Sequence, residues 1–402
     1  MNDWRDVTLG HEIELAYGKS LPAHARRPGR ISVFGSNGRV GTNVEACVDG
    51  PGIVVGRKGS VGEVTYSADD FWPIDTTYYV VNKGNHNWRF LYHLLRHCDL
   101  TGLNSHSAVP GLNREDAYSL GLKIPQRGEQ DDIARVLDCI ESSLQLEFEA
   151  LTNARELKLS CLRELFTRGL RSEAQKDTEI GPVPASWAVV PLGSLGRIGN
   201  GSTPKKTTSA YWDGGRFPWL TSAKVYEREI EAADQFVSDV ALAECHLPRV
   251  KPGAVLMAIT GQGKTLGHCA VLKIEASVSQ HVAYLQTDTD KADPSFIRGY
   301  LETQYEYLRQ VAAGGGSTKG ALTCAFLRDL PVPLPGKDEQ REIVTILDAI
   351  DRKSDLHYRK RQVLENLFKS LLHQLMTNDI SVSDLDLFVL PSASTQREST
   401  AA

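Results

Sequence analysis

Two stretches of the chain share one long alternation of apolar and polar positions. From 129 to 170, and again from 339 to 380, apolar residues recur every three or four positions, the spacing of one face of an α-helix. A shift of 210 positions superimposes the stretches without a gap, so that Glu129 meets Glu339 and Leu137 meets Leu347. Such a helix would extend about 60 Å, which is more than one small domain needs to cover its core. Each helix is therefore expected to have a second partner.

The apolar positions of both stretches follow the a/d seam of a coiled coil. Ser354, His357 and Arg361 interrupt the second seam in its middle, so it is apolar at both ends. Two like helices in one chain most simply bury their seams against each other. The alternative is that each helix covers only the globular segment before it. The residues predicted to pack the helix pair are Ile133, Leu137, Ile140, Leu144, Leu151, Leu162, Leu165, Ile343, Leu347, Ile350, Leu364, Phe368, Leu371 and Leu375.

Each predicted helix follows a globular segment, and the two segments also correspond. WRDVTLG at Trp4–Gly10 reappears as WAVVPLG at Trp187–Gly193, and both segments mix short strands with helical spacing. A proline, Pro125 or Pro335, precedes each helix and marks its entry. The predicted order is a first domain at 1–128, a long helix at 129–170, a linker at 171–186, a second domain at 187–337, a long helix at 338–380 and a disordered tail at 381–402. The fold class is α+β, with two mixed α/β domains joined by long helices.

Composition narrows the function classes. The chain has 402 residues, a net charge of −5 and 24% charged residues, like an ordinary globular protein. It shows neither a signal peptide nor a membrane-spanning apolar run, so we expect a cytoplasmic protein. The seven cysteines form no C-x-x-C pair, which favours reduced thiols over zinc ligands or disulfides, and no metal is expected. Basic residues gather at 19–60 and 196–228, in corresponding parts of the two halves, which indicates two surfaces that face a polyanion.

Four motifs suggest catalysis, and none is complete. GQGKT at Gly261–Thr265 lacks the first glycine of a phosphate loop, because Ala258 stands there. DPSF at Asp293–Phe296 differs from an amino-methyltransferase loop at its third residue, and a proline that starts a helix explains it better. Glu156–Lys158 has the spacing of a nuclease motif but lies inside a predicted amphipathic helix, and His281 has no pattern of a catalytic base around it. The sequence therefore favours a binding protein over an enzyme.

Several motifs in a fixed order resemble one family. They are the duplicated Trp-x-x-Val-x-Leu-Gly openings, the turns FGSNG and GRKGSVGEV, the segment FWPIDTTYYV, the Ile-Pro and Leu-Pro entries followed by Glu-Gln, and the junction GPVPASW. Together they resemble the specificity subunit of a type I DNA restriction-modification system, over roughly residues 1–380. The resemblance implies two target-recognition domains, each reading one half of a bipartite asymmetric DNA sequence, and two long helices that pair antiparallel as a spacer.

The same resemblance implies the partners. They are double-stranded DNA, two methyltransferase subunits and restriction subunits that carry the nuclease and an ATP-driven translocase, and no membrane. Adenosylmethionine, ATP and magnesium would bind those subunits, and this chain would hold no cofactor and catalyse nothing. Two alternatives remain open: a fused methyltransferase or nuclease with an unrecognised site, and a coiled-coil adaptor that does not bind DNA. Methyl transfer by this chain alone would favour the first, and an absence of salt-sensitive DNA binding the second.

Basic and amide side chains in the turns are the candidates for DNA contact. Arginine and lysine suit phosphates and guanine edges, and asparagine and glutamine suit adenine. The predicted DNA-binding residues are Asn37, Arg39, Arg57, Lys58, Ser60, Lys205, Lys206, Ser222, Lys224, Gln262, Lys264, Thr265, Gln280 and Lys319. Neither the target bases nor the spacer length follows from the sequence.

Overall fold

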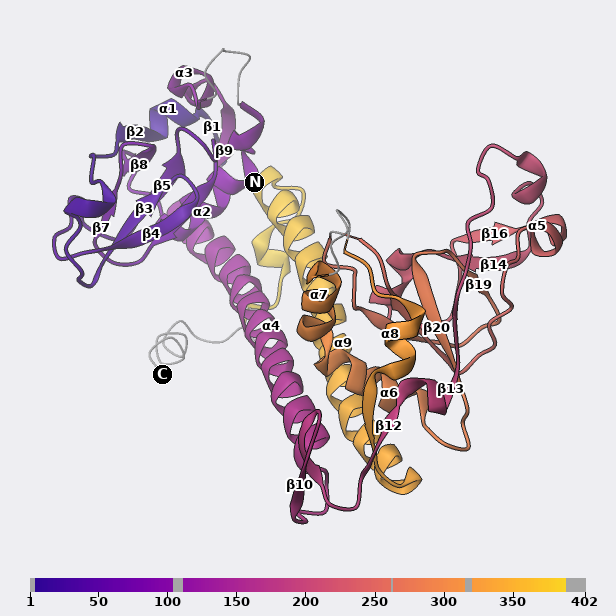
Figure 1. The fold of residues 1–402 in the computed structure, drawn as a ribbon. Coiled ribbons are helices and arrows are strands. Elements are labelled where there is room, and N and C mark those ends of the chain that lie inside the picture. The colour runs from indigo at the N-terminus through magenta and orange to yellow at the C-terminus, as the bar shows by residue number, and fades with distance from the viewer. Residues whose placement is uncertain (1–3, 104–110, 262, 315–319, 388–402) are drawn as a thin grey trace. The chain divides into compact units, whose positions relative to one another are not determined.

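Two long helices organise the chain, as the repeat predicts. The computed structural model describes residues 4–103, 111–261, 263–314 and 320–387. The long helices are α4 (Arg127–Arg168, 42 residues) and α9 (Lys337–Thr377, 41 residues), and each is continuous (Figure 1). The chain divides into two compact units: unit 1 comprises Met1–Glu149 with Tyr358–Ala402, and unit 2 comprises Ala150–His357. Each long helix therefore contributes one half to each unit.

The domain of unit 1 is built on a small antiparallel sheet with strand order β2-β8-β5-β6, beside a second sheet with order β4-β3-β7 and the pair β1-β9. Alternate and continuous runs of β-branched and aromatic residues form these strands, and β5 is buried throughout. Helix α2 packs against β5 and β6, and Asn87 caps its first turn by accepting hydrogen bonds from two backbone amides. The elements are β1 (Arg5–Thr8), α1 (Leu9–Glu12), β2 (Ile13–Tyr17), η1 (Ala23–Ala25), β3 (Ile31–Gly35), β4 (Gly38–Asn43), β5 (Gly52–Gly56), β6 (Val64–Ser67), β7 (Phe71–Pro73), β8 (Thr77–Asn82), α2 (Trp88–His97), η2 (Leu100–Leu103), α3 (Arg114–Tyr118) and β9 (Gly121–Ile124).

The domain of unit 2 repeats this plan. Its main sheet has the order β13-β20-β17-β18-β15, and a second sheet has the order β16-β14-β19, in which β14 and β19 are parallel as β3 and β7 are in unit 1. The pair β12-β21 corresponds to β1-β9, and α6 to α2. The elements are β12 (Ala188–Pro191), η3 (Leu192–Leu195), β13 (Gly196–Asn200), η4 (Ser209–Tyr211), β14 (Phe217–Leu220), η5 (Ser222–Tyr226), β15 (Glu229–Ile230), β16 (Gln235–Val237), α5 (Asp239–Glu244), β17 (Ala254–Ala258), β18 (Cys269–Leu272), β19 (Ser277–Val278), β20 (Val282–Thr287), α6 (Pro294–Thr303), α7 (Tyr305–Gly314), α8 (Cys324–Asp329) and β21 (Pro331–Leu334).

The two long helices pack against each other within each unit. In unit 1, Lys360 of α9 forms an ion pair with Glu147 of α4, and in unit 2 Asp351 of α9 accepts an ion pair from Lys158 of α4 at 3.0 Å. The earlier residue of α4, Glu147, pairs with the later residue of α9, Lys360, and the later residue of α4, Lys158, pairs with the earlier one, Asp351, so the helices are antiparallel. Most of the predicted packing residues belong to the two cores. Buried among them are Ile133, Leu137, Ile140, Phe368 and Leu375 in unit 1, and Leu162, Leu165, Ile343 and Leu347 in unit 2.

The remaining predicted packing residues are less enclosed. Leu144, Leu364 and Leu371 are partly buried against the core of unit 1. Leu151 and Ile350, which lie nearer the middle of the two helices, are half-buried. The apolar contact between the helices is therefore strongest toward the helix ends, as the polar interruptions at the middle of the second seam suggest.

A glutamine fastens each domain to the start of its long helix. In unit 1 the Gln130 side chain accepts a hydrogen bond from the backbone N–H of Asn87 at 3.0 Å and donates one to the backbone oxygen of Pro125 at 3.0 Å. In unit 2 Gln340 accepts from the backbone N–H of Asp293 at 2.8 Å and donates to Pro335 at 2.9 Å. Because buried amides left without partners are costly, these bonds fix the first turn of α4 and α9 against the domain.

The segments that flank the helices are small. The predicted linker at 171–186 contains an antiparallel ribbon of β10 (Gln175–Thr178) and β11 (Gly181–Pro184). After α9, η6 (Val382–Asp384) places Val382 in the core of unit 1, so the first part of the tail predicted to be disordered at 381–402 is ordered. The rest of that tail, from 388 onward, lies outside the described residues. All seven cysteines are free. Among the described residues, none of the helices combines the length and the apolar character that a membrane crossing requires.

Candidate nucleic-acid interface

The glycine-rich turn between β5 and β6 is the first candidate site in unit 1. Gly62, at φ +78°, donates its N–H to the oxygen of Gly56 at 2.8 Å and closes the turn. A Cβ on Gly56 would lie 2.0 Å from the oxygen of Ser60, so only glycine fits there. The tight closure leaves Lys58 exposed at the tip and Ser60 half-buried beside it.

The FGSNG turn lies next to this glycine-rich turn. A Cβ on Gly59 would be 3.2 Å from the hydroxyl oxygen of Ser36, and the oxygen of Ser36 is close to Gly56. The two turns come from different strand pairs, so the sequence alone gave no sign that they meet. The fold thereby brings exposed Asn37 near Lys58, while Arg39 is exposed on the adjoining strand β4.

Arg57 is held more firmly than a free surface arginine. Its guanidinium donates to the backbone oxygen of Asp75 at 2.6 Å and stacks over the rings of Tyr17 and Tyr78, at 5.2 and 6.0 Å. Arg114 stacks on the same Tyr17 ring at 4.7 Å. Burial and the neighbouring Tyr17 raise the pKa of Tyr78 although both guanidiniums oppose this, so its phenol stays protonated. Arg57 therefore orders a cation–aromatic stack whose open member is the exposed ring of Tyr17.

Sequence reasoning missed Tyr17 and Arg114. They lie far from Arg57 along the chain, and neither stands in a glycine-rich turn. An isolated tyrosine at a strand end and an arginine at the start of a short helix carry no distinctive pattern. Only the pairing of β2 with β8, which sets Tyr17 opposite Tyr78, brings these side chains to one place.

The turn between β17 and β18 occupies the equivalent place in unit 2. Gly267, at φ +90°, donates its N–H to the oxygen of Ala258 at 2.9 Å, which repeats the closure between Gly62 and Gly56. Lys264 is exposed, and its backbone oxygen accepts the Tyr305 hydroxyl at 2.6 Å. Gln262 lies outside the described residues. The loop is thus anchored through its backbone, which leaves the Lys264 side chain available.

A stack of aromatic rings also borders this second turn, and its residues are not among those predicted from the sequence. The ring of His268 lies between those of Tyr226 and Tyr305, with centroids 4.8 and 4.7 Å away. The hydroxyl of Tyr226 is 2.9 Å from that of Thr265, a predicted contact residue. Burial lowers the pKa of His268, so the imidazole is neutral at neutral pH. Tyr226 is exposed, and the stack resembles that of unit 1 in place but not in composition.

A chain of polar contacts connects three predicted segments of unit 2. The Gln280 side chain accepts a hydrogen bond from the hydroxyl of Thr203, and its amide nitrogen is 3.1 Å from Nε2 of His281. Nδ1 of His281 is in turn 2.5 Å from the hydroxyl of Thr260, at the start of the turn. Lys205 follows Thr203 closely in the chain. The contacts therefore place exposed Lys205, Lys206 and Gln280 in one region with the Lys264 turn.

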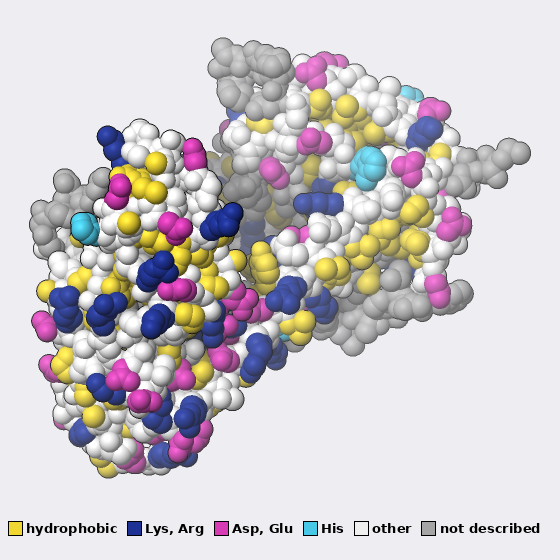
Figure 2. Space-filling model, turned by 90° about the vertical axis from the view of Figure 1, so that its right-hand side faces the viewer, with side chains coloured by type: hydrophobic (Ala, Val, Ile, Leu, Met, Phe, Trp, Pro, Cys, Tyr) yellow, Lys and Arg dark blue, Asp and Glu magenta, His cyan; other side chains and the backbone are white. Residues whose placement is uncertain are grey.

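Two other predicted residues are placed differently. Lys224 is only 9% exposed, and its ammonium pairs with the carboxylates of Glu227 at 2.5 Å and Asp234 at 3.5 Å, which belong to its own domain. Ser222 begins η5 and is half-buried. Lys319 lies outside the described residues. On the face shown in Figure 2, lysine and arginine alternate with acidic side chains, which favours several local contacts over one broad basic surface.

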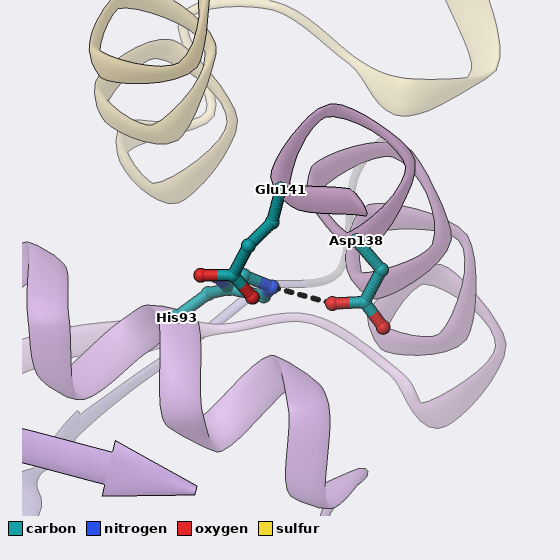
Figure 3. A group of neighbouring side chains, drawn as sticks. All are labelled: His93, Asp138 and Glu141. Carbon is teal, nitrogen blue, oxygen red and sulfur yellow. Dashed lines mark hydrogen bonds and ion pairs between the residues drawn. The ribbon is translucent and has the colours of Figure 1, made fainter. Parts of the chain in front are cut away.

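One side-chain group has the composition of a metal site. Nε2 of His93 on α2 lies 2.7 Å from Oδ1 of Asp138 on α4, and Glu141 is one helical turn further along (Figure 3). The carboxylates are already neutralised. Arg89 donates to both of them, at 2.6 and 2.5 Å, and Arg96 donates to Glu141 at 2.6 Å. A metal ion would have to displace two guanidiniums, so this group is an ion-pair cluster that joins α2 to α4.

These observations define a class of protein. Two copies of one α+β domain stand on paired long helices, and each presents a glycine turn and an aromatic stack with exposed amide and lysine side chains. This is the architecture of a binding protein with two recognition domains. The comparisons agree with it: a family model described as the type I restriction modification DNA specificity domain matches residues 1–154 and 184–366. The chain belongs to this family of DNA specificity domains, and specificity subunits such as those named below are not themselves catalytic.

Individual relatives support the same assignment. The chain is 27% identical over 208 residues to the type I restriction enzyme MjaIX specificity subunit of Methanocaldococcus jannaschii. The aligned residues cover 50% of this chain and 47% of that subunit. The solved type I restriction-modification S subunit from M. genitalium shares the fold, with a TM-score of 0.66 at 16% identity over 93% of this chain and 96% of that chain. A structure that concerns complex assembly and conformational transition of the type I restriction-modification system gives a TM-score of 0.55 at 17% identity, over 93% of this chain and 97% of that chain. The predicted fold class is confirmed, and neither the fused enzyme nor the adaptor is favoured.

Proposed function

We propose that this chain selects the DNA target of a type I restriction-modification complex by reading a bipartite asymmetric sequence, one half with each domain. The observation that carries the proposal is that the glycine turns of the two units are closed by equivalent backbone hydrogen bonds but carry different side chains. The turns at 56–62 and 258–267 close through the same backbone hydrogen bonds, yet they present different side chains. A repeated frame with different contacting groups suits two half-sites of different sequence.

The residues proposed for the first half-site are those gathered around the turn of unit 1. Lys58 would contact phosphate, Asn37 and Ser60 would contact base edges, and Tyr17 offers an exposed ring held by two arginines. Arg57 acts here by positioning Tyr17, since its own guanidinium is engaged with Asp75. For the second half-site the proposed residues are Lys205, Lys206, Lys264, Thr265 and Gln280, with Tyr226 as the exposed ring. Lys224 is not among them, because its ammonium is buried and paired with Glu227 and Asp234.

The long helices are proposed to set the gap between the half-sites and to bind two methyltransferase subunits. Two leucine pairs that are identical in the repeat support the second role. Leu146 and Leu356 are 61% and 65% exposed, and Leu157 and Leu367 are 54% and 43% exposed. Exposure to water does not explain large apolar side chains at equivalent positions of the repeat, whereas binding of one copy of the same partner at each position does. Restriction subunits would join this assembly in the cytoplasm, and adenosylmethionine, ATP and magnesium would bind to the partner subunits.

The test of sequence reading uses the full chain purified with its methyltransferase partner. Methylated adenines are mapped in host DNA with and without the gene, which gives the two-part motif and its gap. Binding is then measured to that motif and to the same half-sites with one base pair added to the spacer. We expect strong preference for the natural gap, and a smaller preference in a Leu347→Asp, Leu371→Asp double variant. Equal binding to both spacers by the natural chain would contradict the proposal.

Docking is tested separately, by co-purification with the methyltransferase subunit. Leu146→Asp and Leu356→Asp should each lower the ratio of methyltransferase subunit to this chain, from two toward one. Val240→Asp is a matched control, because Val240 is 45% exposed on α5, outside the repeated helices. A ratio unchanged in both leucine variants would exclude these positions from the docking surface.

A further inference from the structure

The helices α2 and α6 hold equivalent places in the two units. Each begins directly after the residue whose backbone N–H is bound by the repeated glutamine, Asn87 in unit 1 and Asp293 in unit 2. Counting from these caps, Arg96 of α2 corresponds to Glu302 of α6. An arginine and a glutamate therefore occupy the same position on the surface that each domain turns toward the long helices.

In unit 1 this surface is basic and the long helix α4 is acidic. Arg89 and Arg96 donate to Asp138 and Glu141, and His93 donates to Asp138. Burial alone would raise the pKa of Asp138, but the hydrogen bonds from His93 and Arg89 outweigh it and hold that pKa below its usual range. Two cations thus face two anions in a partly buried contact.

An aromatic ring completes the contact in unit 1. The guanidinium of Arg96 lies over the ring of Phe368 on α9, 4.9 Å from its centroid, and over Tyr92 at 5.2 Å. The place beside Arg96 on α9 is therefore occupied by an uncharged group that favours a cation.

In unit 2 the charges at two of the equivalent positions differ from those in unit 1. Lys158 of α4 pairs with Glu302 of α6 at 2.7 Å and with Asp351 of α9 at 3.0 Å. Asp351 also accepts ion pairs from Arg298 at 3.6 Å and from Arg228 at 3.2 Å. Three cations and the two carboxylates of Glu302 and Asp351 form this contact, and Asp355 adds a third carboxylate near Arg228.

The repeat between the long helices shows which residues exchange places. The shift of 210 positions sets Glu141 on Asp351 and Lys158 on Phe368. The first half of each long helix therefore supplies a carboxylate, Glu141 of α4 to unit 1 and Asp351 of α9 to unit 2. The second halves differ, because α9 supplies the ring of Phe368 to unit 1 and α4 supplies the ammonium of Lys158 to unit 2. A domain of the first kind placed on the helices of unit 2 would bring Arg96 against Lys158. A domain of the second kind on the helices of unit 1 would bring Glu302 close to Glu141 without Lys158, and only its own Arg298, which pairs with Glu302 at 3.4 Å, would balance the two carboxylates.

We propose that these charges match each recognition domain to its own half of the helix pair, so that the two domains are not interchangeable. Arg96 with Phe368 forms one matched pair, and Glu302 with Lys158 forms the other. Exchanging or duplicating a domain creates a contact between like charges in a partly buried place, where screening is weak. The consequence that the two half-sites are read in a fixed order rests on the proposed function. The matching itself does not.

The test asks whether one substitution changes the sign of its effect with its partner. In the full chain, Lys158→Phe removes two ion pairs and should lower Tm by about 4 °C, a typical shift for the loss of such a contact. In a chain carrying Glu302→Arg, the same Lys158→Phe removes the repulsion between Lys158 and the new arginine, while Asp351 keeps its ion pairs with Arg298 and Arg228, and it should raise Tm. A Glu306→Arg background is the matched control, because Glu306 is exposed on α7, and there Lys158→Phe should lower Tm as in the natural chain.

A mirror experiment in unit 1 covers the case in which Glu302→Arg fails to fold. Phe368→Lys should lower Tm of the natural chain and raise Tm of a chain that carries Arg96→Glu. Opposite signs in the two backgrounds support the matching of domain to helices. Shifts of the same sign in both backgrounds, in either unit that folds, would overturn it. Because Tm is measured without DNA, this result does not depend on whether the chain reads a bipartite target.

Discussion

The entries to the two long helices are nearly the same, while the turns that face outward differ. Gln130 and Gln340 make the same pair of hydrogen bonds, to the N–H that precedes the domain helix and to the oxygen of the entry proline. The turn of unit 1 is bordered by Tyr17, whose ring carries two stacked arginines, and that of unit 2 by a histidine between two tyrosines. The comparison teaches that the duplicated parts hold the frame and the divergent parts are free to read different bases.

The difference between the turns has a simple physical origin. Each turn is closed by backbone hydrogen bonds and by a glycine at positive φ, Gly62 or Gly267. This closure does not depend on which side chains the other residues of the turn carry. The stacks are made by residues from other elements, so they can change without disturbing the closure. A domain of this kind can therefore acquire a new specificity while its core and its helix contacts stay intact.

The largest expected effect concerns the shared frame. Leu137 and Leu347 are equivalent in the repeat and are 0% and 2% exposed. Leu137→Ala and Leu347→Ala should each lower the free energy of unfolding by about 2–5 kcal/mol, because each leaves a cavity in the core that joins domain to helices. Denaturant unfolding measures the loss, and the exposed Leu157→Ala is the control, with a change of about 0.5 kcal/mol or less. A large difference between the two core variants would mean that the units are not equivalent frames.

A smaller effect is expected at the two glutamines. Gln130→Ala and Gln340→Ala each leave a part-buried backbone N–H and a buried carbonyl oxygen without their partner, which costs about 1–3 kcal/mol. Equilibrium unfolding measures this cost, and hydrogen exchange should show faster exchange at the N–H of Asn87 in the first variant and of Asp293 in the second. The exposed Gln362→Ala, on α9, provides the control. Unchanged exchange at both amides would show that these bonds do not hold the domains.

The smallest expected effect is confined to unit 1 and depends on pH. Burial lowers the pKa of His93 although Asp138 opposes this, and unit 2 has Gly299 at the equivalent position. Above about pH 6.5, the ordinary value, His93 is neutral both folded and unfolded. Below this pH the unfolded chain binds a proton on His93 more readily than the folded chain does, so the free energy of unfolding decreases as the pH is lowered.

The measurement compares unfolding at pH 7.5 and 5.5. His93→Gln should lose less stability than the natural chain over this interval, because glutamine does not titrate. His24→Gln, at an exposed position, should behave like the natural chain. His97 and His268 also have a pKa lowered by burial, so the variant keeps part of the pH dependence. Identical curves for His93→Gln and the natural chain would contradict this account of the α2 contact.

The sequence by itself determined the long helices, the duplication and the position of the glycine turns. Apolar spacing repeats within a few residues, so α4 and α9 could be predicted within a few residues of their bounds, and glycines in a short run indicate a turn wherever the chain goes. These signals are local, and the physical forces behind them are local too.

Only the tertiary structure decided which of the predicted side chains are available and which others join them. Lys224 is buried against Glu227 and Asp234, and Arg57 is stacked on Tyr17, although both look like free surface cations in the sequence. Tyr17 and Arg114 become neighbours because β2 pairs with β8 and α3 folds back beside them. Contacts between distant segments depend on how whole sheets and helices pack, and a single residue's identity carries no record of its partner across the chain.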